Sequence, residues 1–153
     1  MAILKAGDRI PHFEIPDEDG NMVSSSSLLG KRTILYFYPK DNTSGCTLEA
    51  QSLRDGRKVL AEMGFDIIGV SPDSQKSHQG FICKHSLNFP MLADTDKTLA
   101  QAFGVWAEKK MYGRTYMGIL RTTFIIDADG VIEKVFDKVD TKNHWKQIAE
   151  SYK

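Results

Sequence analysis

The stretch TILYFYPKDNTSGC, residues 33–46, is the part of the chain around which the rest is organised. Its first six residues are β-branched, aromatic and nearly all apolar, which predicts a strand covered on both faces of a sheet. A proline and a polar turn follow, and either Thr43 or Ser44 can cap a helix that begins there. Both choices place Cys46 in the first turn of that helix.

Cys46 is therefore a candidate nucleophile. Backbone N–H groups without partners and the positive end of the helix dipole favour an anion in the first turn. A thiolate is such an anion. A lone cysteine is otherwise most often a small buried residue. The junction of strand and helix, where α/β folds bind and react, favours chemistry for this one.

The whole chain has 153 residues, which fits one domain spanning residues 1–153. Lys+Arg and Asp+Glu balance at 20 each, so we expect neither nucleic acid nor a membrane surface as a partner. The N-terminal residues lack a secretory pattern, and we expect a cytoplasmic protein. Two cysteines are too few for a disulfide scaffold, and in a reducing compartment they are more often catalytic or simply buried.

Outward from the central stretch, the pattern predicts an α/β fold. The pattern first predicts a β-hairpin at 13–16 and 22–24, a helical turn at 27–30, and a helix from Cys46 to Gly64 with Leu53, Val59, Leu60 and Met63 at helical spacing. It then predicts a strand at 65–71, a helix at 75–85, a short strand at 89–94 and a short helix at 96–104. The last part is predicted to form a basic loop at 108–116, a β-hairpin at 121–127 and 131–136, and a helix at 140–152. A tight hairpin forces an antiparallel pair, so we expect a mixed sheet.

Candidate metal and cofactor patterns are weak in this sequence. The run Asp127-Ala128-Asp129-Gly130 resembles the start of an EF-hand loop, but its glycine comes too early, and it predicts a hairpin turn instead. The four histidines are scattered without ligand spacing, and no glycine-rich phosphate loop is present. We expect neither a metal nor a cofactor. Arg121 opens a predicted strand, and the residues alone do not say whether it is solvated or points toward Cys46.

Several motifs resemble one known family. The pattern P-x-x-x-T-x-x-C, from Pro39 through Thr43 to Cys46, resembles the signature of peroxiredoxins. The runs 36–41, 45–50, 53–55, 103–106, 113–121 and 123–127 resemble the bacterioferritin-comigratory-protein, or Q-type, branch of that family. The likeness extends over almost the whole chain.

This resemblance implies a thioredoxin fold with a mixed central sheet, flanking helices and an N-terminal β-hairpin. It implies a monomeric antioxidant peroxidase that reduces hydrogen peroxide and organic hydroperoxides, with thioredoxin or a similar thiol as the reductant. The family's peroxidatic cysteine corresponds to Cys46, its hydroxyl to Thr43, its proline to Pro39 and its arginine to Arg121.

The chain departs from that branch at two positions. Ser44 replaces a common proline, and Gln51 stands where many members have the resolving cysteine. Other members carry the resolving cysteine in the following helix, where this chain has Cys83. The resemblance therefore implies a disulfide between Cys46 and Cys83 during turnover. Because one cysteine starts a helix and the other lies within a second helix, we expect local unwinding, helped by Gly80, before they join.

Ionisation alone does not explain a dedicated peroxidase. Lowering the pKa of a thiol from 8.5 to about 6 increases the thiolate at pH 7 roughly thirty-fold and lowers its nucleophilicity roughly tenfold. The larger contribution must come from donors aimed at the O–O bond, and Thr43, Arg121 and the helix N–H groups are available.

Two other functions are open at this stage. A thioredoxin-like disulfide reductase needs C-x-x-C, but Thr43 replaces the first cysteine. A non-enzymatic redox-sensing or copper-binding module needs C-x-x-x-C and a histidine, and Ala50 stands at the second cysteine position.

Overall fold

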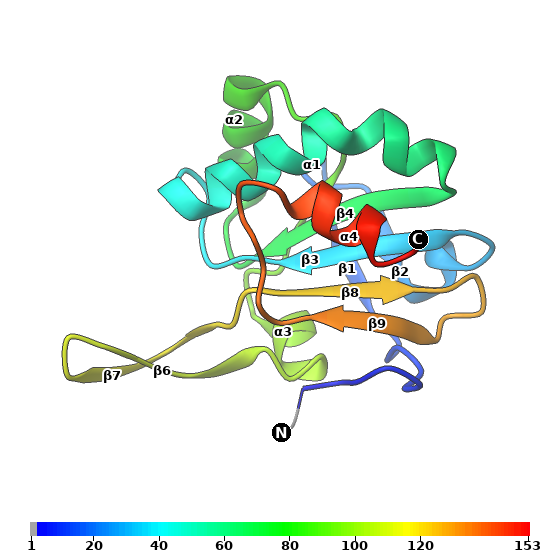
Figure 1. Cartoon of the computed structure of the whole chain (residues 1–153). Coiled ribbons are helices and arrows are strands. Elements are labelled where there is room, and N and C mark those ends of the chain that lie inside the picture. The colour runs from blue at the N-terminus through cyan, green and yellow to red at the C-terminus, as the bar shows by residue number, and fades with distance from the viewer. Residues whose placement is uncertain (1–2) are drawn as a thin grey trace.

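A mixed five-stranded sheet forms the centre of the molecule, which is described here by a computed structural model of residues 3–153 (Figure 1). The strand order is β5-β4-β3-β8-β9. The strands are β3 (Arg32–Phe37), β4 (Phe65–Ser71), β5 (Met91–Ala93), β8 (Thr122–Ile126) and β9 (Ile132–Phe136). β4 runs parallel to β3 and β5 parallel to β4, whereas β8 is antiparallel to both β3 and β9. The predicted mixed sheet is confirmed.

The apolar run in β3 divides between two cores. Ile34 and Tyr36 belong to one cluster of buried side chains, whereas Leu35 and Phe37 belong to the other. Successive side chains of a strand point to opposite faces, so a strand between two cores must be apolar at every position. The strand ends at Phe37, one residue earlier than predicted, and the Tyr38 amide still donates to Val70 O at 3.0 Å.

Helices and a hairpin cover the two faces. One face carries α1 (Ser44–Glu62), α2 (Gln75–His85) and α4 (His144–Glu150). The other carries the hairpin of β1 (Glu14–Pro16) and β2 (Met22–Ser24), the 3₁₀ turn η1 (Ser25–Leu28) and α3 (Thr98–Ala102). These agree with the predicted elements, although η1 begins earlier than predicted and α3 and α4 are shorter.

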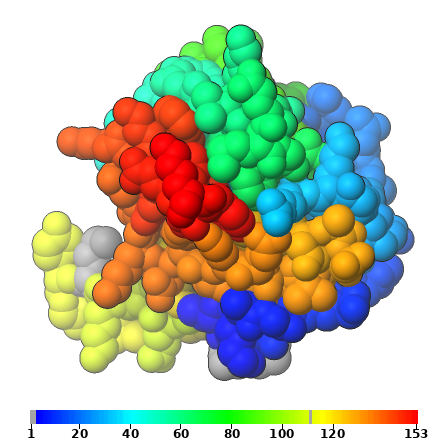
Figure 2. Space-filling model, turned by 45° about the vertical axis from the view of Figure 1, so that its right-hand side comes forward, coloured from blue at the N-terminus to red at the C-terminus, as the bar shows by residue number. Residues whose placement is uncertain are grey.

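The helix α4 packs directly on α1, and the C-terminal residues lie beside α1 on the surface in Figure 2. A Cβ at Gly56 would lie 2.1 Å from Trp145 Cγ, so the close approach depends on glycine. Leu53 and Leu60 are buried, but Val59 is 41 % exposed. The prediction that Val59 faces the core was wrong, because it lies away from the stripe formed by positions 53, 56 and 60.

The predicted loop at 108–116 is instead part of a β-hairpin, β6 (Trp106–Met111) and β7 (Arg114–Ile119), which extends away from the sheet in Figure 1. Tyr112 and Gly113 form its tip with φ of 53° and 77°, as a two-residue turn requires. This prediction was wrong because β7 is exposed over most of its length. A strand without a buried face carries no apolar alternation to reveal it.

The two aspartate-containing turns were predicted correctly. Asp127 Oδ1 accepts from the amides of Asp129 and Val131, and Asp17 Oδ1 accepts from those of Asp19 and Asn21. These carboxylates hold tight turns of the chain. Within residues 3–153, no helix combines the length and the apolar character that crossing a bilayer requires.

Candidate active site

Cys46 lies in the first turn of α1 and is 1 % exposed. Thr43 occupies the N-cap position, as one of the two predicted choices had it, but its side chain does not cap the helix. Its Oγ1 donates to Lys40 O at 2.9 Å instead. The hydroxyl therefore holds the turn between Pro39 and Cys46, and its oxygen lone pairs remain available.

Arg121 is the charged group in contact with Cys46. Its Nη2 donates to Cys46 Sγ at 3.3 Å. The sheet explains this contact, because Thr122 of β8 pairs with Phe37 at the end of β3, and Arg121 is one residue farther along. A Cβ at Gly45 would lie 3.2 Å from Arg121 Nη2, so glycine leaves room for the guanidinium. Of the two orientations left open above, the structure has the one directed at Cys46.

Glu49 is a site residue that the sequence reasoning did not single out. It lies almost one helical turn after Cys46, is buried, and accepts from Arg121 Nη1 through Oε1 at 2.7 Å. Burial raises the pKa of Glu49 to about 7, against the opposing effect of Arg121. The available signal was an acidic residue at i+3 from the cysteine, on the buried side of α1.

His144, at the start of α4, lies behind Glu49. Its Nε2 is 2.8 Å from Thr123 Oγ1 and 3.6 Å from Glu49 Oε2, and its Nδ1 is 2.9 Å from Gln147 Oε1. Burial lowers the pKa of His144 to about 4. Sequence spacing gave no sign of this residue, because only the packing of α4 on α1 brings it to the site.

A second buried network holds the loop before Cys46. His78 of α2 contacts Asp41 Oδ2 through Nδ1 at 2.8 Å and Leu92 O through Nε2 at 2.9 Å. Both ring nitrogens face acceptors, so the protonated ring can donate to each. Burial by itself would lower the pKa of His78, but the hydrogen bond and charge of Asp41 raise it overall. This network ties the loop of Cys46 to α2.

Asp73 joins the same network, and its carboxylate, that of Asp41 and the His78 ring lie within ligand distance of one another. Their facing atoms are already hydrogen-bonded: Asp73 Oδ2 accepts from the Asp41 amide at 2.7 Å and from Ser71 Oγ at 2.6 Å. Ser77 Oγ donates to Asp41 Oδ2 at 2.8 Å. These contacts explain the cluster as a connection between the loop and α2.

Cys83 lies on α2, a different helix from that of Cys46. Both thiols are free, Cys46 buried and Cys83 exposed. Cys83 borders a hollow of about 450 Å³ that Ile82, Phe89 and Pro90 also line. The structure thus brings Cys46 and Arg121 into contact, with Thr43 in the preceding turn, and leaves Cys83 on a separate helix.

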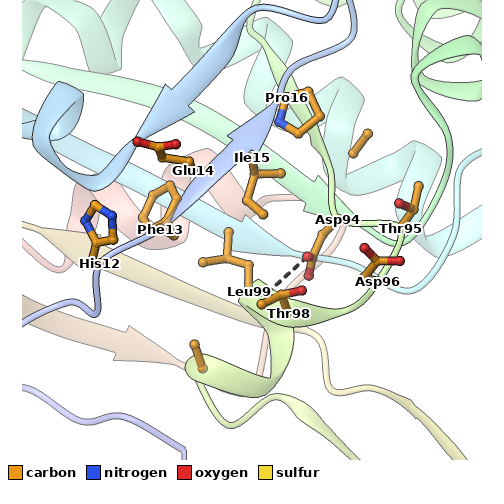
Figure 3. Close-up of a pocket in the computed structure, with 12 residues that line it drawn as sticks. His12, Phe13, Glu14, Ile15, Pro16, Asp94, Thr95, Asp96, Thr98 and Leu99 are labelled. Carbon is orange, nitrogen blue, oxygen red and sulfur yellow. Dashed lines mark hydrogen bonds between the residues drawn. The ribbon is translucent and has the colours of Figure 1, made fainter.

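A smaller but more enclosed hollow lies elsewhere, between β1 and the loop that leads into α3 (Figure 3). It has a volume of about 370 Å³, and its lining contains none of the candidate site residues. Asp94, on its wall, accepts from the amides of Leu99 and Ala100 at 3.0 and 2.9 Å. That carboxylate stabilises the start of α3.

A thiol in the first turn of a helix, an arginine directed at it and a thioredoxin-like sheet agree with the comparison of the chain with known families. The model of the AhpC/TSA family matches residues 6–135. The chain belongs to the AhpC/TSA family. Membership, together with the relatives below, makes it a thiol-dependent peroxidase of the peroxiredoxin class.

Relatives in the peroxiredoxin Bcp branch match nearly the whole chain. Peroxiredoxin Bcp of Escherichia coli K12 is 48 % identical over 144 residues, which are 94 % of this chain and 92 % of that protein. Peroxiredoxin Bcp of Bacillus subtilis is 45 % identical over 150 residues, 98 % of this chain and 96 % of that one. The resemblance to the bacterioferritin-comigratory-protein branch is confirmed.

Solved peroxiredoxin structures share the fold. A mutant of Xylella fastidiosa PrxQ aligns with a TM-score of 0.92 at 29 % identity, covering 99 % of this chain and 97 % of that one. The bacterioferritin comigratory protein of Xanthomonas campestris, described for its alkyl peroxide reduction activity, aligns with a TM-score of 0.86 at 31 % identity over 94 % and 96 % of the two chains. The predicted thioredoxin fold is confirmed.

Proposed function

We propose that the chain reduces hydrogen peroxide and organic hydroperoxides through Cys46. The observation that carries the proposal is the 3.3 Å contact between Arg121 Nη2 and Cys46 Sγ in the first turn of α1. The Cys46 thiolate attacks the terminal peroxide oxygen and the O–O bond breaks. The second oxygen leaves with the electron pair, takes up a proton and departs as water or an alcohol. Cys46 becomes a sulfenic acid.

Arg121 and Thr43 have complementary roles in this step. The guanidinium holds the thiolate and stabilises the charge that moves toward the leaving oxygen. The Thr43 hydroxyl donates its hydrogen bond to Lys40 O. We therefore propose that the Thr43 oxygen accepts a hydrogen bond from the peroxide O–H, rather than donating one as the sequence suggested. Pro39 fixes φ at the start of the turn. Together these residues orient the attacked oxygen against the sulfur.

The sulfenic acid is next resolved by Cys83. The Cys83 thiolate attacks the Cys46 sulfur, the S–O bond breaks as the disulfide forms, and the oxygen leaves as hydroxide, which takes up a proton from solvent to become water. A dithiol reductant such as thioredoxin then returns both thiols to the reduced form. Cys46 is buried in α1 and Cys83 exposed on α2, so local unwinding precedes the disulfide. We propose that the protein does this as a monomer of one domain, in a reducing compartment such as the cytoplasm.

The test compares two nearly isosteric variants, Cys46→Ser and Cys83→Ser. Cys46→Ser replaces the thiolate by a hydroxyl that stays protonated, so peroxide consumption should vanish while circular dichroism shows the same fold. Cys83→Ser should consume one peroxide per chain and then stop with thioredoxin as the reductant. Removing one catalytic group typically lowers activity roughly hundred-fold. If Cys46→Ser keeps more than about a tenth of the wild-type peroxidase activity, Cys46 is not the attacking residue.

A further inference from the structure

One buried carboxylate oxygen at the site has no partner. Glu49 Oε1 accepts from Arg121, but Oε2 is buried and makes no hydrogen bond within the part of the chain described, residues 3–153. A buried polar atom without a partner destabilises the folded chain. The Nε2 atom of His144 lies 3.6 Å from Glu49 Oε2.

The tautomer of His144 follows from its neighbours. Gln147 Oε1 accepts from the Asp140 amide at 3.1 Å, and Gln147 Nε2 donates to Lys138 O at 2.9 Å, which fixes the orientation of the amide. His144 Nδ1 faces that same oxygen, so Nδ1 carries the proton in the neutral ring. Nε2 then presents a lone pair, which accepts from Thr123 Oγ1 at 2.8 Å and faces Glu49.

Two acceptors, Glu49 Oε2 and His144 Nε2, thus face each other in a buried space. A single added proton gives Glu49 Oε2 the partner it lacks, whether the proton is bonded to Oε2 or to Nε2, and the Thr123 hydroxyl at Nε2 can rotate because it both donates and accepts. We propose that Glu49 and His144 hold one proton between them behind Arg121, and that this proton sets how strongly Arg121 stabilises the Cys46 thiolate. The inference rests on the proposed roles of Cys46 and Arg121.

The effect follows from the charges. With the proton present, the pair is neutral and the full charge of Arg121 acts on Cys46. Without it, the Glu49 carboxylate cancels much of that charge through its 2.7 Å contact with Arg121. The pKa of Glu49, raised by burial to about 7, and that of His144, lowered by burial to about 4, mean that the proton leaves as the pH rises through neutrality.

Other titratable groups surround the pair. Burial raises the pKa of the Tyr36 phenol far above its usual range, so it stays neutral beside Glu49 and Cys46. Lys109 faces Arg121 and Cys46 from β6, and burial lowers its pKa. Asp140 faces His144 from the segment before α4.

The experiment follows the ultraviolet absorbance of the thiolate against pH, in chains carrying Cys83→Ser so that only Cys46 contributes. We expect Cys46 to ionise in two steps, because thiolate and carboxylate compete for one guanidinium. Glu49→Gln keeps an acceptor for Arg121 and cannot ionise. It should give one step, with its midpoint lower by about one pH unit, the usual effect of removing a nearby like charge.

His144→Gln is the matched variant, similar in size and neutral at every pH. Its amide can donate to Glu49, which stabilises the carboxylate, so the step due to the pair should move to lower pH. In the Glu49→Gln background, His144→Gln should change the midpoint little. An equal change in both backgrounds means that His144 acts only structurally and overturns the inference. If His144→Gln does not fold, Glu49→Gln decides alone.

A reciprocal measurement separates this inference from the proposed function. By linkage, Cys46→Ser should lower the midpoint of the Glu49 carboxyl carbon resonance by the amount that Glu49→Gln lowers the Cys46 midpoint. A single ionisation step that is the same in wild type and Glu49→Gln overturns the shared proton. That result leaves the peroxidase role of Cys46 intact, whereas peroxide turnover by Cys46→Ser removes the proposed function itself.

Discussion

At the scale of single residues, Arg121 contacts both the Cys46 sulfur and the Glu49 carboxyl group. Arg121→Ala should lower the second-order rate constant for peroxide by roughly 10²–10³, the usual loss for one preorganised donor at a transition state. Stopped-flow measurement of the peroxide reaction checks this. Arg114→Ala, an exposed arginine on β7, is the control and should react like wild type.

A second outcome of the same series would contradict the argument about donors. If Arg121→Ala requires a higher pH to form the thiolate but reacts at the wild-type rate once ionised, the arginine acts only on ionisation. The rate constant per thiolate, rather than per chain, is therefore the quantity to compare. Arg121→Lys should recover only part of the rate, because a single ammonium cannot contact Sγ and Glu49 in the geometry of the guanidinium.

The residues that sequence reasoning found and missed differ in one physical respect. Cys46 lies at a strand-to-helix junction, so local capping and dipole arguments were sufficient to locate it, whereas the family motif singled out Thr43 rather than Ser44. Arg121 was identified through the family motif, because strand order decides what it faces. His144 depends on the packing of α4 against α1, made possible by Gly56 opposite Trp145. Such a contact has no local signature.

At the scale of elements, the proposed resolution by Cys83 involves local opening of α2, and Gly80 lies in the exposed middle of this helix. A Cβ at Gly80 would meet nothing within 4 Å, so alanine fits. Gly80→Ala should stabilise the helix by about 0.5–1 kcal/mol. We expect the disulfide to form roughly two- to five-fold more slowly, measured by rapid quench and thiol alkylation.

The control for Gly80→Ala is an earlier reaction step measured in the same variant. The reaction of Cys46 with peroxide precedes the opening of α2 and should keep its wild-type rate constant in this variant. Arg54→Ala should act in the opposite direction, because Arg54 Nη1 donates to His85 O at 2.7 Å and holds the end of α2 against α1. A disulfide that forms at the same rate in all three chains would show that α2 does not open during resolution.

The bridge between the Cys46 loop and α2 depends on pH. The pKa of His78 is raised in the folded chain, so its stabilisation is fully present below about pH 6.5, the unfolded value, and is lost as the pH rises through the folded value. His78→Gln should lower the free energy of unfolding by about 2–3 kcal/mol in acid and by less in alkali. Urea unfolding at several pH values checks this, with His12→Gln, on an exposed histidine, as the control.

Elements with a buried face were predicted well, and the exposed arm was not. β3, β4 and α2 carry apolar residues where the two cores require them, and their predicted bounds lie within one residue of those observed. The β6–β7 hairpin is held by its own backbone pairing and by contacts such as Lys109 Nζ with Ile119 O at 2.9 Å. Pairing of this kind requires no particular side-chain pattern, so the charged residues were taken for a loop.

At the scale of the whole molecule, the proposed cycle alternates between a reduced chain with intact helices and an oxidised chain in which α1 and α2 are locally unwound. Peroxide-treated wild type should contain a Cys46–Cys83 disulfide within single chains, seen in a non-reducing peptide map. Since α1 and α2 must both unwind locally to form it, the oxidised chain should exchange amide hydrogens faster in these helices than the reduced chain. Only intermolecular disulfides, or a stable Cys46 sulfenic acid, would mean that Cys83 takes no part.

The unequal exposure of the two thiols has a further consequence for chemical labelling. Cys83 is open to solvent, whereas Cys46 is 1 % exposed and packed beneath Arg121. A bulky alkylating reagent therefore reaches Cys83 at the rate of a surface thiol and reaches Cys46 only when the start of α1 opens. The ratio of the two labelling rates thus measures how often the helix opens, in a chain that has not yet met any peroxide.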